Sequence, residues 1–196
     1  MNPKLCILVG SPRPSGNTAS LLEPFVRRME SRGCETKLFR LYDRDIRPCI
    51  ACRTCQTDWE QPNCCQRDGM QEIFDDVLSC DLLVLATPIY SWYCTPPMKA
   101  ALDRMVYALC KYYGGKKGPS LLQGKKMALI STCGYRPENG TDLWETGMKR
   151  YCRHAQMQYC GLLTERHLGY DVPFMDEGKA ERAEAFADRL YQLLSE

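Results

Sequence analysis

The sequence predicts an α/β domain in which a parallel sheet of five strands carries helices on both faces. Strand-like and helix-like segments alternate along the chain, which is the pattern of repeated strand–helix–strand units. The apolar run at residues 82–86 (LLVLA) is continuous, as expected for a strand buried on both faces. A chain of 196 residues can bury a substantial core, so we expect residues 1–196 to form a single domain.

The first strand is expected at residues 5–9, a short apolar run that ends at Gly10. The first helix follows at residues 18–32, where apolar side chains recur at helical spacing. The later elements are expected in this order: strand 36–41, helix 70–79, strand 82–86, helix 97–110, strand 127–132, helix 143–155, strand 162–168 and helix 180–194. Proline suits the first turn of the helix at 97–110, because that turn needs no hydrogen-bonded N–H group.

The composition excludes several classes of partner. With 26 basic and 24 acidic residues the net charge is +2, which favours neither nucleic acid nor a membrane surface as a partner. No apolar run is long enough to span a bilayer. The N-terminal segment has no signal-peptide pattern, so we expect a cytoplasmic protein.

The thirteen cysteines are not expected to form a disulfide framework in a reducing compartment. Those in apolar or helical patterns are expected to be small buried side chains: Cys6, Cys80, Cys110, Cys152 and Cys160. The two histidines, His154 and His167, lie outside the expected ligand loops, and we assign them to the surface or the core. The segment 111–126, rich in lysine and glycine, is expected to be a solvated connection.

The loops that follow the strands are where function is expected. In an open parallel sheet, ligands bind beyond the carboxyl ends of the strands, where the strand order reverses. The loops in question are 10–17, 42–69, 87–96 and 133–140. The first begins GSPRPSGNT and combines hydroxyl, amide and guanidinium donors with a helix N-terminus, which attracts anions. This loop is typical of a phosphate site, although an ordinary capped strand-to-helix turn has similar residues.

The loop PIYSWYCTPP at 88–97 is suited to a flat ring. Its aromatic side chains can stack on such a ring, and its prolines stiffen the backbone. The alternative is an aromatic loop that packs on its own core or on a second subunit. The loop CGYRPENGT at 133–141 offers Gly134 and Tyr135 as further ring contacts, although a polar turn would have the same composition.

Three segments together resemble the flavodoxin-like NAD(P)H-dependent FMN reductases and iron–sulfur flavoproteins. They are GSPRPSGNTASLL at 10–22, CCQRDGM at 64–70 and TPIYSWYCTPPMKAALDRM at 87–105, in the order that the family has. The second half of the chain resembles the family only in its alternation of strands and helices. The resemblance implies a flavodoxin-like doubly wound sheet of order 2-1-3-4-5, bound FMN and a homodimer or tetramer.

The resemblance also implies which residues hold FMN. The phosphate would be bound by Ser11, Arg13, Ser15, Gly16, Asn17 and Thr18. The ring would lie against Pro88, Ile89, Tyr90, Ser91 and Trp92. No catalytic side chain is expected, because the flavin N5 carries the hydride chemistry.

The expected function is therefore an oxidoreductase that passes electrons from NAD(P)H through FMN to an acceptor. The acceptor would be a small molecule or an iron–sulfur cluster, and no motif in the sequence separates NADH from NADPH. One alternative is an electron carrier that docks on a redox partner protein. A second alternative is a zinc-stabilised binding module.

Five cysteines fall within residues 49–65 (CIACRTCQTDWEQPNCC), and the first three are spaced Cys-x-x-Cys-x-x-Cys. Such spacing lets neighbouring thiolates reach several irons of one cluster. The resemblance implies a [4Fe–4S] cluster on Cys49, Cys52, Cys55 and Cys64, with Cys65 as an alternative ligand. Eight residues separate Cys55 from Cys64, a wider gap than in cluster-bearing relatives. On the residues alone, free thiols, a zinc ion and a redox disulfide remain alternatives.

Overall fold

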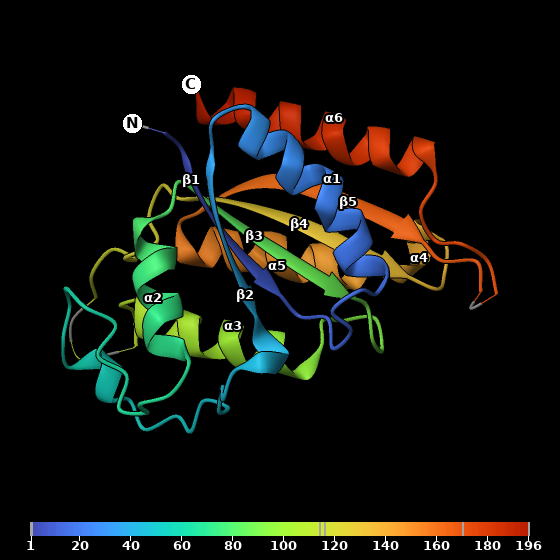
Figure 1. Ribbon diagram of the computed structural model, residues 1–196. Helices are drawn as coiled ribbons and strands as arrows, with labels where there is room; N and C mark the ends of the chain where they lie inside the picture. Colours follow the sequence, from blue (N-terminus) through green and yellow to red (C-terminus); the bar gives the residue numbers. More distant parts are fainter. Residues whose placement is uncertain (1, 114, 116, 170, 196) are drawn as a thin grey trace.

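The computed structural model describes residues 2–113, 115, 117–169 and 171–195. In this part of the chain, five strands form a sheet in the order β2-β1-β3-β4-β5 (Figure 1). The strands are β1 (Lys4–Val9), β2 (Glu35–Arg40), β3 (Leu82–Pro88), β4 (Lys126–Cys133) and β5 (Gln158–Arg166). All neighbouring strands pair in parallel. The flavodoxin-like fold class and the strand order 2-1-3-4-5 are thus confirmed.

Helices cover both faces of this sheet. One face carries α1 (Asn17–Ser31) and α6 (Glu177–Leu194); the other carries α2 (Met70–Ser79), α3 (Pro96–Leu109) and α5 (Asp142–Ala155) (Figure 1). Three short segments lie in the loops: η1 (Leu41–Asp43), η2 (Thr54–Gln56) and α4 (Pro137–Gly140). No described helix combines the length and the hydropathy needed to cross a membrane.

The alternation of side chains along the strands divides the core into two layers. Leu5 and Ile7 of β1 pack under α1 and α6, whereas Cys6 and Leu8 pack on the opposite side. The central strand β3 is buried along almost its whole length, which explains its continuous apolar run. The strand β2 lies at one edge of the sheet, and its Leu38 is 43% exposed beside α1.

The last strand differs from the sequence prediction. It begins at Gln158 instead of residue 162 and ends at Arg166, so that Leu168 lies beyond it and is 70% exposed. Cys160 is half-buried instead of buried, because β5 is the other edge of the sheet. Leu143, at the start of α5, is exposed.

The segment 111–126 is not a solvated connection throughout, contrary to the prediction. The side chains of Lys111, Ser120 and Leu122 are buried. The segment folds back on the end of α3, because the N–H of Leu121 donates to the carbonyl oxygen of Leu109 at 2.9 Å. This segment is structured despite its lysine-rich composition, and the ammonium group of Lys111 is buried in it.

Candidate functional site

Two adjoining cavities lie at the carboxyl edge of the sheet, with volumes of ≈ 320 Å³ and ≈ 260 Å³. Ile89, Cys133 and Gly134 line both cavities, across the ends of β3 and β4. The larger cavity also contains Arg13 and Asn17 from the loop before α1. These volumes and this position at a reversal of strand order are typical of a small-molecule site.

Most of the residues predicted to hold a ligand meet at these cavities. The larger one is lined by Arg13, Asn17, Pro88, Ile89, Tyr90 and Gly134. The smaller one is lined by Ile89, Ser91, Trp92, Gly134 and Tyr135. Ser11, Ser15, Gly16 and Thr18 belong to the same loop but do not line the cavity walls.

The loop between β1 and α1 leaves the helix N-terminus open to a ligand. No side chain caps α1 after Gly16, and its first turn holds no acidic residue. The first bond inside the helix runs from the N–H of Ser20 to the carbonyl oxygen of Gly16 at 3.0 Å. The N–H groups of the first turn therefore have no acceptor within the helix. Together with the guanidinium of Arg13, they are suited to bind an anion.

Two hydroxyl groups hold this loop in shape. The Oγ of Ser11 is buried and accepts a hydrogen bond from the N–H of Arg13 at 3.3 Å. The hydroxyl of Thr18 bonds with that of Thr132 on β4 at 2.9 Å. Gly16 is required at its position, because a Cβ there would lie 2.9 Å from the Cβ of Arg13.

The loop after β3 contains a tight hairpin. Tyr90 and Tyr93 exchange backbone hydrogen bonds at 2.9 and 3.0 Å, and the two residues between them, Ser91 and Trp92, have φ values of 49° and 61°. Two positive φ values at the centre of a hairpin define a type I′ turn, which normally contains Gly or Asn. Non-glycine residues in this conformation store strain of about 1–3 kcal/mol each, and such strain concentrates at functional sites.

Aromatic rings flank the smaller cavity. The rings of Trp92 and Tyr135 stack with their centroids 5.7 Å apart and their planes 15° from parallel. Both side chains are largely exposed, so this pair forms an outer wall rather than part of the core. The two ring loops predicted from the sequence thus approach each other across the cavity.

His167 lies at the larger cavity, contrary to the prediction that it stays outside the ligand loops. It directly follows β5, and its N–H donates to the carbonyl oxygen of Cys133 at 2.9 Å. Its Nε2 lies 3.2 Å from the point where a Cβ of Gly134 would be. The sequence rule that predicted the other loops could have found this residue, because the carboxyl end of the fifth strand reaches the same edge. Thr132 at the end of β4 was missed for a related reason: it belongs to the strand itself, whereas Cys133 falls within the predicted loop 133–140.

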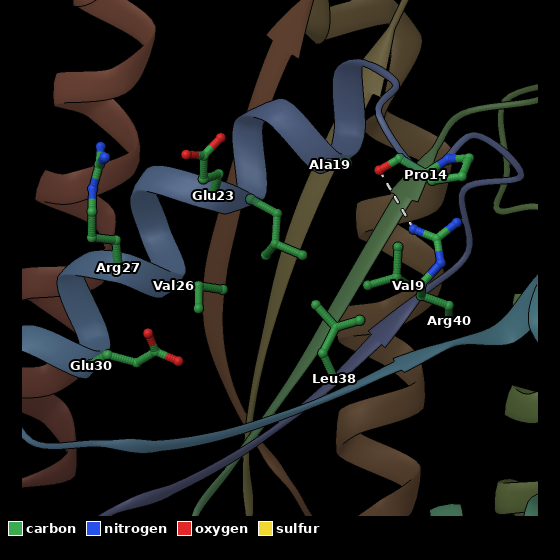
Figure 2. Close-up of a pocket in the computed structure, with 10 residues that line it drawn as sticks. Val9, Pro14, Ala19, Glu23, Val26, Arg27, Glu30, Leu38 and Arg40 are labelled. Carbon is green, nitrogen blue, oxygen red and sulfur yellow. Dashed lines mark hydrogen bonds between the residues drawn. The ribbon is translucent and has the colours of Figure 1, made fainter.

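A larger cavity of ≈ 480 Å³ lies outside this edge, between α1 and β2 (Figure 2). Its floor is apolar, with Val9, Val26 and Leu38, and none of the predicted site residues lines it. At one end, Arg40 donates from Nη1 to the carbonyl oxygen of Pro14 at 3.5 Å (Figure 2). We place the functional site at the carboxyl edge despite the smaller volume, because the open helix N-terminus and Arg13 converge only there.

The cysteine segment forms a second site at the other end of α3. All five cysteines line one small cavity: Cys49, Cys52, Cys55, Cys64 and Cys65. The sulfur atoms of Cys52 and Cys65 lie 3.2 Å apart, and both residues are exposed. The ring loop leads into α3, which begins at Pro96. Arg104 lies eight residues further along this helix and lines the cysteine cavity. The helical rise between Pro96 and Arg104 is roughly 12 Å. In Figure 1 the cysteine loop lies at the lower left, at the far end of α3 from the ring loop.

A fully buried ion pair anchors the cysteine cavity. Arg104 bonds from Nη1 to the Oδ2 of Asp68 at 2.6 Å, and neither side chain is exposed. From Nη2 the same guanidinium donates to the Sγ of Cys64 at 3.3 Å. Burial raises the pKa of Asp68, but hydrogen bonds from Arg104 and backbone N–H groups outweigh that effect and hold the pKa below its ordinary value.

The thiols of the cavity differ in acidity. Hydrogen bonds from Thr54, and a further one from Cys65, lower the pKa of Cys52 to about 7. Burial instead raises the pKa of Cys55, whose Sγ donates to the carbonyl oxygen of Tyr107 at 3.2 Å. A thiolate is the form that binds metal, so the exposed Cys52 is the member most readily available as a ligand.

The donor set of this cavity fits an iron–sulfur cluster, but the enclosed volume is small. The cavity measures ≈ 20 Å³, which is room for about one water molecule. A cluster therefore requires the outer wall, with Cys52 and Cys65, to move outward. Within the described residues, no group of three or more His, Cys, Asp or Glu side chains is already arranged around a single metal ion.

Comparison with known proteins gives matches over most of the chain. Residues 3–143 match the family described as NADPH-dependent FMN reductase. An iron–sulfur flavoprotein from Archaeoglobus fulgidus is 34% identical over 116 residues, which are 59% of this chain and 51% of that protein. Another from Methanocaldococcus jannaschii is 32% identical over 101 residues, 52% of this chain and 51% of that protein. The chain thus matches about half the length of these curated relatives.

Solved structures share the fold at low sequence identity. An NAD(P)H:quinone oxidoreductase from Methanothermobacter marburgensis superposes with a TM-score of 0.65 at 19% identity, covering 100% of this chain and 98% of that one. A flavodoxin from the domain Archaea superposes with a TM-score of 0.60 at 12% identity, covering 98% of this chain and 99% of that one. Identities this low support the flavodoxin-like fold alone.

Proposed function

The chain belongs to the NADPH-dependent FMN reductase family, and from that premise we propose that it binds FMN and passes electrons from NAD(P)H to an acceptor. The observation that carries the proposal is the meeting of the open α1 N-terminus, the strained ring loop and the end of β4 at two adjoining cavities. This arrangement offers anion donors at one end and aromatic walls at the other.

The residues of the first loop suit the phosphate of FMN. Arg13 brings a permanent positive charge to the cavity, and the first-turn N–H groups of α1 add neutral donors. Asn17 lines the same cavity with an amide. Ser11 and Thr18 act indirectly, since their hydroxyls fix the loop in place.

The other walls suit the ring and its edge. Trp92 and Tyr135 can limit the access of water to a ring bound between the loops. His167 adds an imidazole to the wall of the larger cavity from the end of β5. When bound, FMN supplies hydride chemistry at N5, so these side chains need only bind, orient and shield it.

The cysteine cavity is proposed to hold a [4Fe–4S] cluster. The proposed ligands are Cys49, Cys52, Cys55 and Cys64, with Cys65 as the alternative fourth ligand. Support comes from the convergence of five thiols on one cavity and from the names of the curated relatives, which are iron–sulfur flavoproteins. A zinc ion has less support, because among the described residues no ready-made group of ligands surrounds one point.

The exposure of Cys52 and Cys65 favours a second function, electron carriage to a partner protein. Electrons from a cluster here could leave through the outer wall without a small-molecule acceptor. The two functions differ in one readout, because a pure carrier would retain flavin but would not oxidise NAD(P)H.

A homodimer or tetramer is part of the proposal, since a second chain could bring its cysteine loop to the ring loop of its neighbour. Sedimentation velocity tests this oligomeric state.

An absorption spectrum of anaerobically purified protein, with iron and acid-labile sulfide assayed on the same sample, tests both cofactors. Flavin bands with about four irons per chain would support FMN and the cluster together. Flavin bands without iron would leave an FMN reductase and remove the cluster. Absence of flavin even after addition of FMN would contradict the proposal.

A further inference from the structure

Lys111 carries a buried positive charge beside the cysteine cavity. It lies two residues beyond Leu109, the last residue of α3, and its side chain is fully buried. Its Nζ donates to the carbonyl oxygens of Cys55 at 2.9 Å and Gln61 at 2.7 Å. Within the part of the chain that the structure describes, no carboxylate forms an ion pair with it. The nearby carboxylate of Asp58 instead accepts hydrogen bonds from the N–H groups of Glu60 and Gln61.

Such an ammonium group is unfavourable without a compensating negative charge. Removal of a charge from water carries a large penalty, and two neutral carbonyl groups offset only part of it. The other buried cation of the region, Arg104, is neutralised by Asp68. Lys111 thus adds a buried positive charge beside the cysteine segment that no ion pair within the described residues neutralises.

The two carbonyl groups that bind Lys111 lie within the wide gap of the cysteine segment. Cys55 and Cys64 flank a stretch of eight residues, and Gln61 lies near the far end of that stretch. The ammonium group of Lys111 thus links the two ends of the loop between Cys55 and Cys64. The loop then returns Cys64 to the cavity, where its Sγ meets Nη2 of Arg104.

We propose that Lys111 is a positioning residue that closes the enlarged cysteine loop and supplies the buried counter-charge of an iron–sulfur cluster in this cavity. This inference rests on the cluster of the proposed function. Four thiolate ligands give such a cluster net negative charge, which complements the charge of Lys111. The reduction potential of such a cluster depends on the net charge and the hydrogen bonds around it. The positive charge of Lys111 should raise this potential, because it favours the reduced form, which is the more negative one.

The test compares Lys111→Met, which keeps the aliphatic stem, with Lys111→Arg, which keeps the charge. Lys117→Met is the matched control, because Lys117 is an exposed lysine of the same segment. Each protein is reconstituted anaerobically with iron and sulfide, and its iron content and midpoint potential are measured. We expect Lys111→Met to lower the midpoint potential or the iron content, and Lys111→Arg to lower either by less. Lys117→Met should match the wild type in both.

A second measurement separates counter-charge from ordinary structural support. The cluster-free forms of wild type and Lys111→Met are unfolded in urea. We expect the two forms to differ little in the free energy of unfolding, because the variant loses two hydrogen bonds but also loses a buried charge that no ion pair neutralises. A clearly less stable cluster-free variant, or a variant with unchanged potential and iron content, would overturn the inference. A wild-type protein that binds no iron would overturn the cluster proposal as well, whereas normal iron binding with an unaffected variant would overturn the role of Lys111 alone.

Discussion

The hydroxyl groups of Thr18 and Thr132 form a buried hydrogen bond of 2.9 Å. Thr18 lies in the first turn of α1 and Thr132 near the end of β4, 114 positions apart in the sequence. The bond fixes the start of α1 against Thr132, which lines the cavity of ≈ 320 Å³. The proposed FMN site therefore depends on a contact between the two halves of the chain.

Replacement of Thr132 with valine tests this contact. We expect the free energy of unfolding to fall by about 1–3 kcal/mol, because the hydroxyl of Thr18 is left buried without a partner. FMN binding should weaken as well, since the loop loses its attachment. Thr164→Val is the matched control, because the Thr164 hydroxyl on β5 is buried and has no partner within the described residues. Equal losses of stability in the two variants, measured by urea unfolding, would contradict the role assigned to the Thr18–Thr132 bond.

Removal of the Arg13 charge should weaken the binding of phosphate selectively. Arg13→Ala is expected to raise the dissociation constant of FMN by about ten- to a hundredfold, the effect of losing a charge-assisted hydrogen bond. The binding of riboflavin, which has no phosphate, should change little. Arg27→Ala is the control, since Arg27 is an arginine of α1 that lines neither cavity of the proposed FMN site, and its side chain is 68% exposed. If calorimetry gave the same loss for FMN and riboflavin, Arg13 would not be the phosphate ligand.

The ion pair of Asp68 and Arg104 predicts a pH-dependent stability. The pKa of Asp68 is lowered in the folded protein, so its contribution is complete above the ordinary aspartate value of about 4 and is lost as the pH falls through the folded pKa. Asp68→Asn should cost about 3–5 kcal/mol at neutral pH, because Arg104 keeps a buried charge without its partner.

The difference between wild type and Asp68→Asn should shrink in denaturant titrations below about pH 4. Asp45→Asn, with a side chain 79% exposed in the same segment, is expected to have little effect at any pH. A deficit in Asp68→Asn that stays constant with pH would rule out the charge as its cause.

Cys64 and Cys65 should differ as ligands although they are neighbours. Cys64 lies inward with its Sγ on Arg104, whereas Cys65 is exposed beside Cys52. We expect Cys64→Ser to lose most of the bound iron after reconstitution and Cys65→Ser to retain it. The reverse result would make Cys65 the fourth ligand and leave Cys64 as a thiol held by Arg104.

The alternation of apolar segments was sufficient to predict the sheet, because parallel strands buried on both faces leave continuous runs such as that of β3. Segments beyond the ends of the strands were predicted less well. His167 was missed because the fifth strand was expected to run to residue 168, whereas β5 ends at Arg166 and leaves His167 at the edge of the sheet, beside the cavity. Burial of Lys111 could not be predicted either, since it depends on carbonyl groups of the cysteine loop, more than 45 positions away.

Anaerobic titration of the FMN-loaded protein with NADPH, and separately with NADH, decides whether the chain is an FMN reductase. We expect the purified protein to bind FMN at one site per chain, and at least one nucleotide to bleach the visible flavin absorbance completely. Arg13→Ala should need more FMN to reach the same loading, whereas Arg27→Ala should behave as the wild type. Bound FMN that neither nucleotide reduces would contradict the reductase function, and failure to bind FMN would contradict the site itself.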